Sequence, residues 1–195
     1  MFYRRLELVK TIYFVRHGET RFNLYHKVQG RCDSPLTELG IKQAKLVRDY
    51  FKKNSISFSQ AFSSPQERAC DTLEIITEHK MKYIRLDSLK EKDYGIFEGE
   101  PEYLLPWKYS NVEEYPGMES NAHVILRMHR SIERILGKLK DTENALVVSH
   151  GNIIGRYIYN EVSKDVTLRM DNGSIFEVVY GDSSVSLKRY IHNMI

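Results

Sequence analysis

Two short apolar runs stand out from a chain in which most other segments are amphipathic. Residues 12–15 (Ile-Tyr-Phe-Val) and 145–148 (Ala-Leu-Val-Val) each contain four apolar residues, and a glycine follows shortly after each run. Runs of this length, rich in β-branched and aromatic side chains, are typical of strands buried on both faces of a sheet. We also predict strands at 58–63 and 83–86.

Longer stretches repeat apolar residues every three or four positions, which predicts amphipathic helices. One begins after Thr37 and another after Ser120 or Asn121, residues suited to capping a helix N-terminus. Near the end of the chain, segments 175–180 and 185–190 predict a hairpin. The alternation predicts an α/β fold, a three-layer α/β/α sandwich in which helices cover both faces of a mostly parallel central sheet.

Composition narrows the class of protein. The chain has 195 residues, of which 42% are hydrophobic and 28% charged, values ordinary for a globular protein and suited to a single domain over residues 1–195. A formal net charge of +3 is too small to indicate nucleic-acid binding, although it suits a small anionic substrate. No apolar run is long enough to cross a membrane, and residues 1–10 lack the apolar region of a secretory signal.

The chain has two cysteines, Cys32 and Cys70. They are too few for a disulfide framework, and neither has the spacing of a metal site. We therefore expect two reduced thiols in a cytoplasmic protein, and we predict neither a metal nor a cofactor. The sequence does not indicate an oligomeric state.

Histidines stand at the ends of the two strongest predicted strands. Arg16 and His17 follow the first run, and His150 follows the second. Ligand sites in open α/β sheets lie at the carboxyl ends of the strands, so the two imidazoles meet over one pocket if these strands are parallel neighbours. Either histidine alone is more often an ordinary residue at a strand end. Together with Arg16 they indicate a site for an anion.

The motifs around these histidines resemble those of the histidine phosphatase superfamily, which includes the phosphoglycerate mutases. The opening Arg-His-Gly-Glu-Thr at 16–20 with Asn23, and Ser-His-Gly at 149–151, match the family in order. Further matches between them cover most of the chain: Gln29-Gly30, Asp33, 35–37, Leu39-Gly40, Gln43-Ala44, 63–65, Arg68-Ala69, Thr72, Glu91, Tyr94-Gly95, Glu98-Gly99 and Glu119-Ser120.

The resemblance implies a role for each matched residue. His17 would be the nucleophile that forms a phosphohistidine, and Arg16, Arg68 and His150 would hold the phosphate. Glu91 would donate a proton to the leaving group. The substrate-binding positions are then Arg16, Asn23, Gln29, Gly30, Arg68 and Tyr94. Guanidinium and imidazolium groups supply the positive charge that phosphoryl transfer needs, so this chemistry requires no metal.

Local features support some of these roles. An amide side chain and a glycine that exposes backbone N–H groups, as at Gln29-Gly30, suit a phosphate pocket. The segment 64–67 (Ser-Pro-Gln-Glu) matches a capping box, which would place Arg68 on the first turn of a helix. We interpret Lys27 and Arg31 as solvated residues of a basic loop at 21–31.

The assignment of Glu91 depends on the resemblance alone. It lies between two lysines, a setting typical of a solvated charge, and Asp93 and Glu98 are competing carboxylates nearby. For His17 to attack, its second ring nitrogen must donate to a carbonyl or similar acceptor. His150 would act best when charged, and a nearby phosphate would raise its pKa.

Residues 98–118 form a segment without periodicity, which we interpret as a lid or specificity segment. Trp107 within it is either part of the lid or a hydrophobic surface anchor. The mutases have a longer, basic insertion here, whereas this chain has Glu100, Glu102, Glu113 and Glu114 against a single lysine at 108. The acidic lid predicts a substrate with one phosphate and a neutral or cationic remainder.

The sequence therefore predicts a metal-independent phosphatase that hydrolyses small-molecule phosphate monoesters. The alternative is phosphoryl transfer of the phosphoglycerate mutase type, which the Tyr94 and Asn152 positions also match. A phosphate-binding regulator that has lost catalysis is the weakest alternative, because the set of Arg16, His17, Arg68, Glu91 and His150 is intact.

Overall fold

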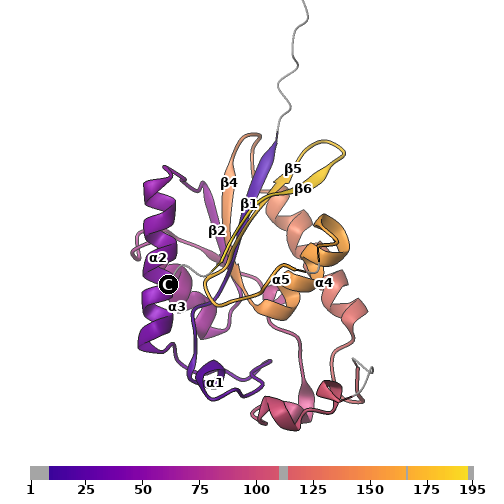
Figure 1. The fold of residues 1–195 in the computed structure, drawn as a ribbon. Coiled ribbons are helices and arrows are strands. Elements are labelled where there is room, and N and C mark those ends of the chain that lie inside the picture. Colours follow the sequence, from indigo (N-terminus) through magenta and orange to yellow (C-terminus); the bar gives the residue numbers. More distant parts are fainter. Residues whose placement is uncertain (1–8, 110–113, 166, 193–195) are drawn as a thin grey trace, which may run out of the picture.

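The computed structural model describes residues 9–109, 114–165 and 167–192, without the Lys108 side chain. Within these ranges a single sheet has six strands in the order β3-β2-β4-β1-β5-β6 (Figure 1). Neighbours β3, β2, β4 and β1 are parallel, and β5 runs antiparallel to both β1 and β6. The strands are β1 (Lys10–Arg16), β2 (Gln60–Ser63), β3 (Ile84–Arg85), β4 (Asn144–Ser149), β5 (Ile175–Tyr180) and β6 (Val185–Ile191).

Helices cover both faces of this sheet, which confirms the predicted α/β fold. Helices α2 (Glu38–Lys53) and α3 (Glu67–Ile76) lie on one side, and α4 (Asn121–Leu136) and α5 (Gly151–Tyr157) lie on the other (Figure 1). A π-helical turn at Ile158–Val162 continues α5.

The two apolar runs form the centre of the sheet, where both faces are covered. Ile12 and Phe14 of β1 pack into the core shared with α4 and α5. Tyr13 and Val15 face the opposite way and pack with residues of α2 and α3. Complete burial of such side chains contributes about 1.5–3 kcal/mol each, which explains why these runs show no polar alternation.

The helix starts agree with the sequence in two places and differ in two others. The Thr37 and Ser120 hydroxyls cap α2 and α4 by accepting backbone N–H groups of the first turn at 3.0 and 3.1 Å. The predicted capping box at 64–67 is wrong, because the N-cap of α3 is Gln66 and has no side-chain cap bond. A capping box instead joins Thr20 to Asn23, so the expected loop at 21–31 begins with a helical turn, α1 (Arg21–Leu24).

The predicted lid is partly fixed by backbone hydrogen bonds to residues 26–28. The N–H of Val28 donates to the Glu100 carbonyl at 3.0 Å, and the N–H of Glu102 donates to the His26 carbonyl at 2.7 Å. Two 3-10 turns follow, at Glu102–Leu104 and Pro106–Lys108. Residues 110–113, including Glu113, lie outside the described part of the chain. Among the described helices, none combines the length and apolar character needed to cross a bilayer.

Candidate active site

The ends of β1 and β4 bring His17 and His150 together. The strands are adjacent and parallel, with Arg16 opposite Ser149, so the next residue of each chain segment leaves the sheet at the same edge. The two imidazole centroids are 5.1 Å apart, with the ring planes at 60°. Both side chains are buried. This confirms the predicted meeting of two histidines that are distant in sequence.

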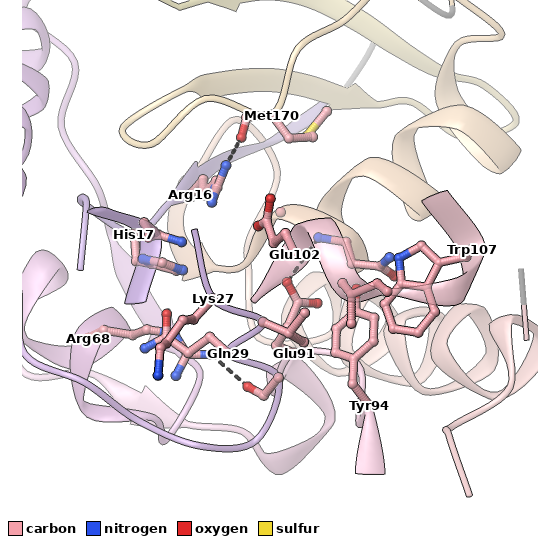
Figure 2. Close-up of a pocket in the computed structure, with 16 residues that line it drawn as sticks. Arg16, His17, Lys27, Gln29, Arg68, Glu91, Tyr94, Glu102, Trp107 and Met170 are labelled. Atoms are coloured by element: carbon pink, nitrogen blue, oxygen red, sulfur yellow. Dashed lines mark hydrogen bonds between the residues drawn. The ribbon is translucent and has the colours of Figure 1, made fainter. Parts of the chain in front are cut away.

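A cavity of about 450 Å³ opens above this pair. Eight of the nine residues predicted for the site line it (Figure 2), and the ninth, His150, lies against His17. The eight are Arg16, His17, Asn23, Gln29, Gly30, Arg68, Glu91 and Tyr94. The cavity therefore gathers the residues that the sequence motifs had separated over most of the chain.

The guanidinium groups of buried Arg68 and half-buried Arg16 form the cationic floor of the cavity. Arg68 donates to the carbonyls of Gly30 and Cys32, both at 2.8 Å, and to the Asp33 carboxylate at 2.9 Å. Arg16 donates to the Met170 carbonyl. Among the described residues, neither Nε atom has a hydrogen-bond partner. A buried donor without a partner costs about 1–3 kcal/mol, and an anion in the cavity would remove that cost.

The hydrogen bonding of His17 fixes which ring nitrogen can react. Its Nδ1 lies 2.8 Å from the Gly18 carbonyl, which can only accept, so Nδ1 carries the proton and Nε2 has the lone pair. Burial, followed by the charges of Arg68 and Arg16, holds the pKa of His17 well below its ordinary value. The imidazole is therefore neutral, as a nucleophile requires.

His150 differs from the expectation of a charged imidazole. Burial, followed by the charge of Arg68, lowers its pKa well below the ordinary value. Neither ring nitrogen has a hydrogen-bond partner among the described residues. The charged form therefore requires an anion close by to balance the two guanidinium groups.

Glu91 is fixed by backbone groups from two segments. Its Oε2 accepts the N–H of Asn152 at 3.0 Å, and its Oε1 accepts those of Ile153 and Lys92 at 3.2 and 2.8 Å. Its own N–H donates to Gln66 Oε1 at 2.8 Å. These bonds hold the carboxyl group on the far side of the cavity from His17 (Figure 2).

The two competing carboxylates serve other purposes. Glu98 accepts the backbone N–H groups of Arg31, Cys32 and Tyr94 at 2.7, 2.9 and 3.1 Å, so it holds the loop after Gly30. Asp93 accepts the N–H of Gly95 at 2.8 Å and does not line the cavity. Of these three carboxylates, only Glu91 lines the cavity. The sequence alone does not make this distinction.

The remaining predicted residues shape the wall of the cavity. Asn23 Oδ1 accepts the N–H of Thr20 at 3.2 Å, and the Thr20 hydroxyl donates to Gln29 at 2.9 Å. Gly30 has φ +53°, in the left-handed region that favours glycine. Burial, followed by the charge of Glu91, raises the pKa of the Tyr94 phenol, which keeps it protonated.

The lid contributes three residues that were not assigned to the site. Trp107 lines the cavity and stacks on Tyr94, with centroids 5.8 Å apart. Glu102 and Leu105 line the same wall. No motif marks these positions, because their place depends on the backbone pairing with residues 26–28.

Two further residues show where sequence reasoning failed. Lys27 was expected to be solvated but lines the cavity, because the pairing with the lid turns it inward. Asn172 donates to the backbone carbonyl of His17 at 3.0 Å and to Asn23 Oδ1 at 3.2 Å. It follows no strand-end pattern and gave no signal in the sequence. Among described side chains, no group of three His, Cys, Asp or Glu residues is placed to hold a metal.

Known proteins are similar to this chain in both sequence and fold. Residues 12–193 match the Histidine phosphatase superfamily (branch 1). The "Uncharacterized phosphatase PhoE" of Bacillus subtilis is 31% identical over 180 residues, covering 90% of this chain and 91% of that protein. The "Probable phosphoglycerate mutase GpmB" of Proteus mirabilis is 32% identical over 187 residues, covering 88% and 86%.

A solved structure agrees with these relatives. The phosphoglycerate mutase from Bacillus anthracis superposes with a TM-score of 0.83 at 28% identity, covering 96% of this chain and 95% of that one. The matched region includes the strand-end histidines and all the residues of the cavity. This chain belongs to the histidine phosphatase superfamily, branch 1.

Proposed function

We propose that this protein is a phosphatase that hydrolyses small-molecule phosphate monoesters through a phosphohistidine on His17. The observation that carries the proposal is the neutral His17 ring, whose Nδ1 is bound to the Gly18 carbonyl and whose Nε2 is available beside two guanidinium groups. Such an arrangement supplies a nucleophile and fixed positive charge, the two elements of phosphoryl transfer.

In the first step, Nε2 of His17 attacks phosphorus opposite the ester oxygen. The new N–P bond forms as the P–O bond to the alcohol breaks, and the bonding electron pair leaves with the oxygen. Glu91 gives its proton to that oxygen, so a neutral alcohol departs. Arg16, Arg68 and a protonated His150 stabilise the charge on the equatorial oxygens.

The second step returns the enzyme to its starting state. Glu91, now a carboxylate, takes a proton from a water molecule as the water oxygen attacks phosphorus. The N–P bond breaks, its electron pair returns to Nε2, and inorganic phosphate leaves. One carboxyl group thus acts as acid and then as base, for which acid–base catalysis typically supplies roughly 10² to 10⁴ in rate.

The lining of the cavity supports hydrolysis over the mutase alternative. Beyond the floor formed by Arg16 and Arg68, the described lining has one more cation, Lys27, and it is accompanied by the Glu102 carboxylate. A mutase must hold a substrate with a second anionic group while excluding water, which calls for more cations than this wall offers. Relatives of both kinds exist, so a direct measurement is needed.

The test compares two reactions of the purified protein. Release of inorganic phosphate from monoesters is measured beside conversion of 3-phosphoglycerate to 2-phosphoglycerate, with and without a bisphosphate primer. We expect phosphate release and no primer-dependent conversion. Conversion that exceeds phosphate release in the presence of the primer would establish the mutase instead.

For the substrate, we infer a single phosphate on a neutral or cationic remainder. The remainder would contact the outer wall, where Trp107, Tyr94 and Leu105 offer apolar surface and Glu102 offers negative charge. In a panel of esters, bisphosphorylated sugars should be poorer substrates than monophosphates of similar size. We further infer a cytoplasmic location, where Cys32 and Cys70, both free thiols, would stay reduced.

A further inference from the structure

A buried ion pair lies outside the cavity, behind the loop that carries Glu91. Arg127 of α4 is 6% exposed, and the Glu119 side chain is 5% exposed. Arg127 donates from Nε to Glu119 Oε1 at 2.6 Å and from Nη2 to Glu119 Oε2 at 2.9 Å. Such a bidentate pair fixes the plane and the direction of the guanidinium group.

The remaining N–H groups of Arg127 point to the backbone of the Glu91 loop. Nη1 donates to the carbonyl of Ser88 at 2.9 Å and to that of Lys90, and Nη2 donates to the carbonyl of Glu91 at 3.1 Å. The Glu91 loop lies between a 3-10 turn that ends at Leu89 and another that begins at Gly95. One side chain therefore supplies the bonds that a helix or strand would otherwise provide.

Glu119 joins this loop to the loop after Gly30. Its Oε2 accepts the N–H of Asp93 at 3.1 Å and the Arg31 guanidinium at 3.4 Å. Its own N–H donates to the Asp93 carbonyl at 2.9 Å. The loop with the candidate proton donor and the loop after Gly30 are thus connected through one carboxylate.

Stability alone is a weak reason for this arrangement. A buried ion pair is often no more stabilising than well-packed apolar side chains, because both charges lose their hydration. The ion pair instead fixes orientation. Its two side chains bind five groups at once, namely the carbonyls of Ser88, Lys90 and Glu91, the N–H of Asp93 and the guanidinium of Arg31. Misplacing a catalytic group by about 1 Å can cost roughly 10²-fold in rate.

We propose that Arg127, oriented by Glu119, is a positioning residue for Glu91 and sets the reach of its carboxyl group toward the leaving oxygen. The proposal rests on the function proposed above. Arg127 does not line the cavity, so it acts through Glu91 and not on the substrate.

The test is Arg127→Lys, measured with p-nitrophenyl phosphate and with an alkyl ester such as glycerol 2-phosphate. p-Nitrophenolate leaves without a proton, whereas an alkoxide needs one. We expect kcat on the alkyl ester to fall about 10- to 100-fold. The rate of the p-nitrophenol burst, which reports the first step alone, should change by less than about threefold. In a Glu91→Gln background, Arg127→Lys should cause no further loss.

The controls separate positioning from folding. Arg130→Lys, an exposed arginine on the same helix, should leave both activities unchanged. Should Arg127→Lys fail to fold, Glu119→Gln keeps the shape of the carboxyl group, and the same contrast between esters is expected. Slowing of the p-nitrophenol burst to the same extent as alkyl ester turnover, or losses that add to those of Glu91→Gln, would overturn the positioning role while leaving the phosphatase intact. Absence of phosphate release by the unmodified enzyme would overturn the proposed function as well.

Discussion

The imidazoles of His17 and His150 lie 5.1 Å apart although the two residues are far apart in the sequence. Their proximity follows from the parallel pairing of β1 with β4, in which Arg16 is opposite Ser149. Both rings are buried beside Arg16 and Arg68, so their pKa values are lowered, first by burial and then by the nearby charges. On the proposed function, this arrangement suits a neutral nucleophile at His17 and a partner, His150, that becomes charged when a phosphate binds.

Glu91→Gln removes the proton that the leaving group takes and keeps the shape of the side chain. We expect kcat for alkyl phosphates to fall by roughly 10² to 10⁴. The first step with p-nitrophenyl phosphate should be nearly unaffected, because p-nitrophenolate is stable without protonation. A burst of p-nitrophenol in stopped-flow measurements checks this. Slowing of the burst to the same extent as alkyl ester turnover would remove Glu91 from the role of acid.

The buried histidines predict a dependence of stability on pH. Their pKa values lie well below the ordinary value of about 6.5, so the unfolded chain binds more protons near pH 6. Stability must then fall as pH falls through 6.5. Between pH 7.5 and 5.5 each histidine should contribute a loss on the order of 1 kcal/mol.

Urea unfolding at both pH values measures this dependence. The variant His150→Gln should lose less stability than the unmodified protein over this range, by an amount on the order of 1 kcal/mol. An equal loss in both proteins would show that His150 does not remain neutral in the folded state.

Gly30 is predicted to tolerate no side chain. Its φ is +53°, and a Cβ there would lie 2.2 Å from Glu98 Oε1, the atom that accepts the N–H groups of Arg31 and Tyr94. Gly30→Ala should therefore lower the free energy of unfolding by about 1–2 kcal/mol for the backbone alone, with a further loss from displacing Glu98. It should also raise KM, because the Gly30 carbonyl accepts from Arg68.

Gly99→Ala is the matched control for that substitution. Gly99 has φ +85°, and nothing lies within 4 Å of its added Cβ, so it should suffer only the backbone cost. The comparison uses chemical unfolding and steady-state kinetics of both variants. If the two alanines destabilise the protein equally, Glu98 does not hold the loop as described.

Trp107→Ala tests the wall that would receive the remainder of the substrate. Loss of stacking, worth about 0.5–1.5 kcal/mol, should raise KM for aryl phosphates roughly 3- to 10-fold. Inhibition by inorganic phosphate should be unchanged, because phosphate would contact only the floor. The control is Tyr109→Ala, because Tyr109 belongs to the same segment and is 77% exposed. Equal effects of Trp107→Ala on aryl esters and on inorganic phosphate would contradict this division of the cavity.

The elements that carry the strongest local signal were predictable from sequence. Strands β1 and β4 each contain a four-residue apolar run that is followed shortly by a histidine, and such runs are typical of strands buried on both faces. Thr37 and Ser120 were recognisable as caps because Thr and Ser are preferred at helix N-termini. In the structure their hydroxyls accept N–H groups of the next turn. These features depend on residues close together in sequence.

Features that depend on distant backbone pairing were not predictable. Lys27 turns into the cavity only because residues 26–28 pair with the start of the lid. Glu91 differs from Asp93 and Glu98 through the N–H groups of α5 that it meets, which no local pattern encodes. The charge of His150 also depended on how completely the fold buries it.

His17 is the residue on which the whole account depends. His17→Ala should reduce turnover by at least about 10⁴-fold, because removal of a catalytic nucleophile typically lowers kcat on that scale. Because the substitution leaves the strand and its neighbours in place, the circular dichroism spectrum should be unchanged. Retention of near-normal activity would exclude His17 from the mechanism.

The most direct measurement is the capture of the covalent intermediate. Glu91→Gln is mixed with ³²P-labelled p-nitrophenyl phosphate, because this ester can still phosphorylate His17 while hydrolysis of the N–P bond lacks its base. After an alkaline quench and proteolysis, we predict label on the peptide that contains His17. The double variant that carries both Glu91→Gln and His17→Ala should take up no label. Turnover without label on His17, or label elsewhere that persists in His17→Ala, would contradict the account.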